Sequence, residues 1–194
     1  AYAEQLAAAL ALLLLKQRDA VGLVRFDEAV AASVAPRARA AHFQRIMQLL
    51  SAEPAGRESR PDLALREAAA LVRRPGLVIL VSDLLCEPEP VRAALRALRA
   101  GGHDVLVLHV LDPGERELPD APAGAVWVDP ESGIELAASA RDVRDRYRAA
   151  ARDALADWQR LFLEQGARYA LCGTEAPFGL ALRRAFAARE ALRA

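Results

Sequence analysis

Two uninterrupted apolar runs place the strongest constraint on what this chain can fold into. Residues 77–81 read LVILV and residues 105–108 read VLVL. A strand that covers one face of a sheet alternates apolar with polar residues, whereas a continuous apolar run is typical of a strand buried on both faces. Segments of helical character bracket both runs, and parallel strands need such crossovers. The runs therefore predict the centre of a parallel α/β sheet.

The rest of the chain supplies the helices and outer strands that such a sheet requires. Helices are predicted over residues 2–17, 39–51, 61–73, 89–100, 140–165 and 177–191, and strands over 21–26, 29–34, 77–81, 104–111 and 169–171, with a small hairpin that pairs 125–128 with 134–136. This order predicts a single α/β domain over residues 1–194. Its sheet is mostly parallel, with helices on its faces, a β-hairpin insertion and a long helix near the C-terminus.

Composition excludes several classes of protein. The 194 residues are 54% hydrophobic, which is enough for one full core and excludes wholesale disorder. The 26 basic and 26 acidic side chains balance, so a general nucleic-acid binder is not expected. Two cysteines make no disulfide framework and favour a reducing, cytoplasmic compartment. The ten apolar residues from Leu6 to Leu15 fall short of the about 20 that span a bilayer, so no membrane contact is expected from this segment.

Asp83 is the most informative carboxylate in the sequence. It follows the apolar run 77–81, and ligands of open α/β sheets collect at the carboxyl ends of strands. Ser82 adds a hydroxyl beside it. An aspartate at this position can hold a divalent cation or accept hydrogen bonds from loop amides, and it can equally serve as a structural or helix-capping residue.

A cysteine-phosphatase pattern is present but is interpreted as accidental. Cys86 and Arg92 satisfy the C-x5-R spacing of those enzymes. Their chemistry needs backbone N–H groups around a phosphate and a reactive thiolate. The intervening residues 87–91 contain two prolines, which remove donors, and two glutamates, which repel an anion.

Two further polar groups receive structural interpretations. His109, Asp112 and Glu115 are spaced by three, but a strand followed by a Pro-Gly turn does not bring them together, so His109 is expected to be a hydrogen-bonded strand histidine. Thr174 is expected to cap the final helix. The sequence has no phosphate-binding glycine loop, dinucleotide fingerprint, nucleophile elbow or H-E-x-x-H motif, and no enzymatic activity is expected.

Several segments, taken in order, carry a family resemblance that covers nearly the whole chain. They are residues 2–10, 19–23 with Phe26, 80–85, 109–113 with Glu115, 129–133, 143–147, 169–174 and 177–189. Together they resemble a bacterial family with a von Willebrand factor A-like domain, numbered fifty-eight among the domains of unknown function. The resemblance implies a von Willebrand factor A-like, Rossmann-like sheet in which the helix over residues 2–17 follows a first strand that ends in a metal-binding Asp-x-Ser-x-Ser motif. The chain is then truncated upstream of Ala1, and the loss of that strand leaves an unpaired, apolar gap in the sheet.

The same resemblance implies a set of metal ligands. Asp83 falls at the position of the distal aspartate of a metal-ion-dependent adhesion site. The position of the usual threonine aligns best with Pro61, which cannot ligate, and Ser59 or Asp62 could substitute for it. Mg²⁺ or another divalent cation is therefore expected only if the upstream motif is intact.

The family also implies a function. It suggests a non-enzymatic adaptor that works with a MoxR-type AAA+ ATPase in the maturation or assembly of other proteins. Two alternatives remain open: a structural subunit of a larger assembly, and a small α/β hydrolase or phosphatase that uses Asp83 with Cys86.

Overall fold

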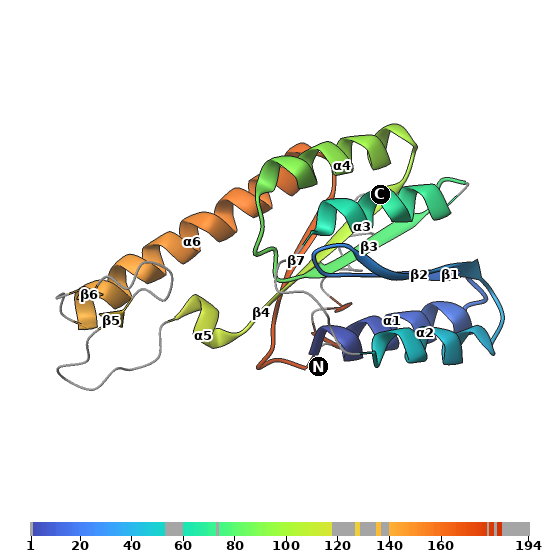
Figure 1. Cartoon of the computed structure of the whole chain (residues 1–194), viewed down its shortest axis with the longest axis horizontal. Helices are drawn as coiled ribbons and strands as arrows, with labels where there is room; N and C mark the ends of the chain where they lie inside the picture. The colour runs from blue at the N-terminus through green and yellow to red at the C-terminus, as the bar shows by residue number, and fades with distance from the viewer. Residues whose placement is uncertain are drawn as a thin grey trace.

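The parallel sheet predicted from the two apolar runs is present. The computed structural model describes residues 2–52, 60–72, 74–117, 127–128, 135–136, 140–177, 179–180 and 182–183 (Figure 1). Three strands, β3 (Leu77–Ser82), β4 (Asp104–Leu111) and β7 (Arg168–Gly173), form a parallel sheet in the order β3-β4-β7. Strand β4 thus has hydrogen-bonded neighbours on both edges.

Helices cover both faces of this sheet. Figure 1 shows α3, α4 and α6 on one side of the sheet and α1 and α2 on the other. The bounds are α1 Tyr2–Lys16, α2 His42–Leu50, α3 Pro61–Leu71, α4 Pro88–Ala100, α5 Pro113–Arg116 and α6 Ala140–Glu164. The long helix near the C-terminus and the crossover helices are therefore confirmed, with boundaries shifted by a few residues at most.

The side chains of β4 divide between the two layers. Val105 and Val107 pack with the α3, α4 and α6 layer, whereas Leu106 and Leu108 pack with Leu6 of α1 and its neighbours. These four side chains are all buried. Both faces of a central strand meet helices, which is why this run is apolar at every position.

Two hairpins complete the described strands. Strands β1 (Val21–Phe26) and β2 (Val30–Arg37) pair antiparallel in a sheet of their own. The second strand is longer than predicted and contains Pro36, which is tolerated because β2 is an edge strand. The predicted insertion is present where β5 (Trp127–Val128) pairs with β6 (Glu135–Leu136). The predicted terminal helix over 177–191 lies mostly outside the described residues.

A short helix replaces the turn expected after β4. Asp112 is the N-cap of α5 and accepts a hydrogen bond from the Gly114 N–H at 2.9 Å, and the Glu115 carboxylate accepts one from the Asp112 N–H at 2.7 Å. This reciprocal pair is a capping box, and it was readable in the sequence as Asp followed three residues later by Glu.

The aromatic core predicts a large difference between two adjacent positions on α6. Phe162 is 0% exposed and stacks on Trp158, whereas Leu163 is 62% exposed. We expect Phe162→Ala to lower the free energy of unfolding by about 3–5 kcal/mol because it leaves a cavity. The matched control, Leu163→Ala, should change it by about 0.5 kcal/mol or less. Urea unfolding measures both, and equal effects would contradict this core assignment.

Candidate functional site

The carboxyl ends of the three parallel strands bring together the polar residues singled out in the sequence. Asp83 follows β3, Asp112 follows β4, and Thr174 follows β7. Because the strands are parallel, these positions lie along one edge of the sheet, here named the carboxyl edge. The predicted strand-end position of Asp83 is confirmed.

The turn after β3 has a fixed, unusual conformation. Leu84 adopts a φ of 56°, in the left-handed region that non-glycine residues rarely occupy. Its N–H donates to the Ser82 hydroxyl at 3.1 Å, and the Leu85 N–H donates to the Asp83 carboxylate at 3.3 Å. The Leu84 side chain is buried in the core, while Leu85 is 67% exposed. The strained backbone of this turn therefore places the Leu84 side chain in the core and leaves the Leu85 side chain in contact with solvent.

The ring of His109 on β4 fixes the position of this turn. Its Nε2 lies 2.7 Å from the Asp83 carbonyl oxygen, and its Nδ1 lies 2.8 Å from the Tyr169 hydroxyl. A carbonyl only accepts, so Nε2 carries the proton, and in a neutral ring Nδ1 accepts from Tyr169. Burial lowers the pKa of His109, which favours that neutral ring. The expected hydrogen-bonded strand histidine is confirmed, and both ring nitrogens are occupied.

Tyr169 ties the same contact to the core. Its ring stacks on Phe162 with centroids 5.7 Å apart, and it meets the ring of His109 edge-on. Burial raises the pKa of Tyr169 well above its usual range, so its hydroxyl remains protonated and can donate. The backbone position of Asp83 is consequently set by a chain of contacts that runs from α6 through β7 and β4 to the turn after β3.

The loops after β4 and β7 are joined in a similar way. The Thr174 hydroxyl donates to the Asp112 carboxylate at 2.7 Å, and Arg116 pairs with Glu175. The hydrogen bond from Thr174 lowers the pKa of Asp112. Thr174 was expected to cap the final helix, most of which lies outside the described residues. Its hydroxyl bridges two strand ends, a contact between residues that lie far apart in the sequence.

Asp62, one of the candidate metal ligands, is already paired. It is buried at the start of α3, and Arg60 donates to both of its carboxylate oxygens at 2.9 and 3.1 Å. The hydrogen bond from Arg60 also lowers the pKa of Asp62. Ser59, the other candidate substitute, lies outside the described residues.

Asp62 and Asp83 are the candidate metal ligands that the described part of the chain includes. Within that part of the chain, no three His, Cys, Asp or Glu side chains gather in a way that could hold a metal ion. The guanidinium of Arg60 supplies the positive charge beside Asp62. Metal binding through Asp83 stays a prediction from the resemblance.

Cys86 lacks the chemistry of a phosphatase nucleophile. Burial, with added repulsion from Asp83 and Asp62, raises the pKa of the Cys86 thiol to about 11. Arg92 of the C-x5-R pattern forms ion pairs with Glu164 at 3.1 Å and with Glu89 at 3.3 Å. A cysteine nucleophile needs a depressed pKa, so these contacts oppose the pattern's enzymatic interpretation.

The layered fold and its carboxyl edge define an α/β domain with a parallel sheet and firmly positioned strand-end loops. The chain belongs to the family described as "Protein of unknown function DUF58", whose model matches residues 1–157. This finding confirms the family of unknown function to which the sequence was compared, over residues 1–157, whereas its von Willebrand factor A-like character stays an expectation.

The curated relatives are uncharacterised. The protein Rv1480 of Mycobacterium tuberculosis and the protein Mb1516 of Mycobacterium bovis are each 42% identical over 85 residues, which is 42% of this chain. The match spans 25% of the length of each relative.

Two solved structures share the fold. The conserved hypothetical protein BatB from Bacteroides thetaiotaomicron superposes with a TM-score of 0.58 at 13% identity, covering 98% of this chain and 89% of that one. An aerotolerance-related membrane protein from Bacteroides fragilis NCTC 9343 gives 0.53 at 14% identity, over 88% and 81% of the two chains. At this identity the likeness shows the fold alone. Within the described residues, no helix has both the length and the apolar character needed to span a bilayer.

The buried neutral histidine predicts a pH dependence of stability. The unfolded chain takes up a proton at His109 near pH 6.5, whereas the folded protein, with its lowered pKa, resists it. The free energy of unfolding should therefore fall as the pH drops below about 6.5. His109→Gln, which keeps an amide donor but does not titrate, should lose less stability between about pH 7.5 and about pH 5.5. Urea unfolding at both pH values measures the free energy of unfolding of the two proteins. Equal losses in the native protein and in the variant would contradict a neutral, buried His109.

The raised pKa of Cys86 predicts an unreactive thiol. With a pKa of about 11, the folded protein should react with iodoacetamide at neutral pH on the order of 100-fold more slowly than an ordinary exposed cysteine. The same chain unfolded in urea is the control and should react normally. Rapid alkylation that inorganic phosphate suppresses would restore the phosphatase interpretation.

Proposed function

We propose that this chain is a non-enzymatic, von Willebrand factor A-like adaptor that docks a MoxR-type AAA+ ATPase in the maturation or assembly of other proteins. The docking surface is the turn after β3, residues 82–86, at the carboxyl edge. We place this segment of the protein in the cytoplasm, where such an ATPase has access to it. One of the structural neighbours is described as a membrane protein, which is compatible with an anchor elsewhere in that chain.

The observation that carries the proposal is the display of Leu85. Contact of a large apolar side chain with water is unfavourable, and Leu85 is 67% exposed. Leu85 lies on a turn that two hydrogen bonds, from the Leu84 N–H to the Ser82 hydroxyl and from His109 to the Asp83 carbonyl, hold in one conformation. Rigid apolar anchors of this kind dominate the energetics of protein interfaces. Asp83 beside it adds a carboxylate that can orient a cationic group of the partner.

We further propose that docking needs no metal ion. The pairing of Asp62 with Arg60 supports this, since a cation at that position would have to displace the guanidinium. The adhesion-type metal site is in this proposal degenerate. Contacts of the turn and the neighbouring loops then provide the affinity that a bridging cation would otherwise supply.

Two other functions are weaker. The high pKa of Cys86 opposes a phosphatase or hydrolase. A structural subunit of a larger assembly would use the same apolar anchor, but its association would not depend on nucleotide. Dependence on ATP therefore separates the adaptor from the structural subunit.

The test is a pull-down from the lysate of the source bacterium, with the N-terminally extended protein as bait. We expect an AAA+ ATPase to be recovered with ATP and Mg²⁺. After loading, the bait should retain it in EDTA. Leu85→Asp should reduce recovery by about 10-fold or more, because it removes a central apolar contact and places a charge in the interface.

Asp104→Ala is the matched control, since Asp104 is an exposed carboxylate at the start of β4, at the opposite edge of the sheet. It should leave recovery unchanged. Loss of the ATPase in EDTA and with Asp83→Ala would instead establish a metal-bridged contact. Absence of any ATPase in every condition would overturn the adaptor proposal.

A further inference from the structure

Two exposed leucines lie beside a cation near the end of α1. Leu12 and Leu13 are 40% and 44% exposed, and Lys16 follows them by four and three positions. Side chains three and four positions apart share one face of a helix, so these three lie together on the outer face of α1. Because contact of large apolar side chains with water is unfavourable, this face is a candidate for contact with a surface outside the chain.

Three exposed arginines lie at the same end of α1. Arg18 follows the helix in a left-handed conformation with a φ of 64°. Arg37 pairs across the β1–β2 ladder with Val21, which lies three residues beyond Arg18, and Arg39 follows shortly after. Figure 1 shows the end of α1, the start of β1 and the connection from β2 to α2 at one end of the molecule. We name six residues the basic patch: Leu12, Leu13, Lys16, Arg18, Arg37 and Arg39.

The cations of the basic patch are not used in ion pairs. Within the residues that the structure describes, no carboxylate pairs with Lys16, Arg18, Arg37 or Arg39. The exposed carboxylate of Asp19 follows Arg18, and the four cations outnumber it. The helix dipole favours cations at the end of α1, but it disfavours Arg39, which precedes the start of α2. The dipole therefore does not explain the whole cluster.

The other end of the molecule carries the opposite charge. Helix α1 begins there, because the Tyr2 hydroxyl donates to the Ala176 carbonyl at 3.2 Å, just beyond β7. The carboxyl edge is mainly acidic, and its exposed carboxylates include those of Glu87, Asp112, Glu115, Glu117 and Glu175. The sequence has no net charge, so this separation gives the domain an electrostatic polarity that can orient it on a charged surface.

These features together fit an anionic lipid bilayer. Such a surface attracts clustered lysine and arginine side chains, takes exposed leucines into its interfacial region and repels an acidic edge. A nucleic acid would engage the cations but would leave the leucines in water. We propose that the basic patch docks this domain on an anionic membrane surface, with Leu12 and Leu13 in the interface and the four cations against lipid phosphates.

The proposal goes beyond the adaptor function and does not rest on it. The sequence-based expectation of no membrane contact followed from an apolar run too short to span a bilayer, and contact with the surface needs no such length. The 15 residues of α1 separate the basic patch from the carboxyl edge by about 20 Å. On the membrane, the turn after β3 therefore faces away from the lipid and stays open to a partner.

A fluorophore on the basic patch tests the contact in the whole protein. An NBD dye attached at Leu13→Cys should brighten on addition of phosphatidylcholine vesicles with about one third phosphatidylglycerol, because the dye enters the interface. Vesicles of phosphatidylcholine alone should give little change. Leu163→Cys on α6, where the leucine is 62% exposed, is the matched control and should respond to neither. Cys86→Ser removes the partly exposed native thiol from both proteins.

Paired charge reversals test the cations. Arg37→Glu with Arg39→Glu should weaken binding to the anionic vesicles by about 10-fold or more, because each basic side chain near the surface adds to the attraction. Arg96→Glu with Arg160→Glu alters exposed arginines of α4 and α6, changes the net charge equally and should leave binding unchanged.

Three results would overturn the proposal. The first is no response of the dye at position 13 to the anionic vesicles. The second is an equal response from position 163, or an equal loss of binding with the control pair on α4 and α6. The third is binding to duplex DNA of equal strength that survives Leu12→Gln with Leu13→Gln, which would favour a nucleic acid as the occupant.

Discussion

The structure depends on the burial of β4 between two helical layers. This strand is hydrogen-bonded on both edges, and its alternate side chains supply the centre of the two cores on either face of the sheet. His109 belongs to the same strand, so the group that fixes the turn after β3 cannot move without disturbing the core. The position of Asp83 is in this sense a consequence of core packing.

The sequence predicted those features that depend on local pattern. The apolar runs predicted β3 and β4, the helical periodicities predicted the flanking helices, and the strand-end rule placed Asp83 at the carboxyl edge. Features that depend on distant partners could not be predicted. The contact of His109 with Tyr169 requires the register between β4 and β7, and the bridge from Thr174 to Asp112 joins residues 62 positions apart.

Other features eluded prediction for local reasons. Burial of the Leu84 side chain and the hydrogen bond to the Ser82 hydroxyl hold Leu84 in its left-handed conformation. A leucine does not favour that conformation, so the residue type does not predict it. The pairing of Asp62 with Arg60 could have been suspected from their spacing of two, but burial of the carboxylate could not. Asp62 was predicted as a possible metal ligand, but both of its carboxylate oxygens already accept hydrogen bonds from Arg60.

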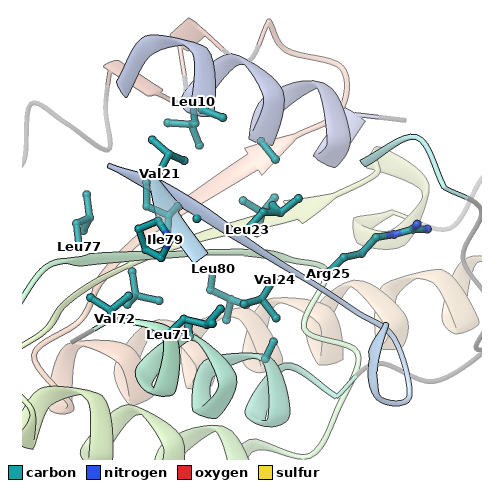
Figure 2. Close-up of a pocket in the computed structure, with 18 of the residues that line it drawn as sticks. Leu10, Val21, Leu23, Val24, Arg25, Leu71, Val72, Leu77, Ile79 and Leu80 are labelled. Carbon is teal, nitrogen blue, oxygen red and sulfur yellow. The ribbon is translucent and has the colours of Figure 1, made fainter. Parts of the chain in front are cut away.

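The large pocket between β1 and β3 (Figure 2) reaches the carboxyl edge, because Asp83 is among the residues that line it. The most direct measurement is photo-crosslinking in the source bacterium, with a photoreactive amino acid at position 85 or at the similarly exposed position 163 on α6. We predict an adduct with an AAA+ ATPase from position 85 and none from position 163. An adduct of equal yield from position 163, or none from position 85, would contradict docking through the turn after β3.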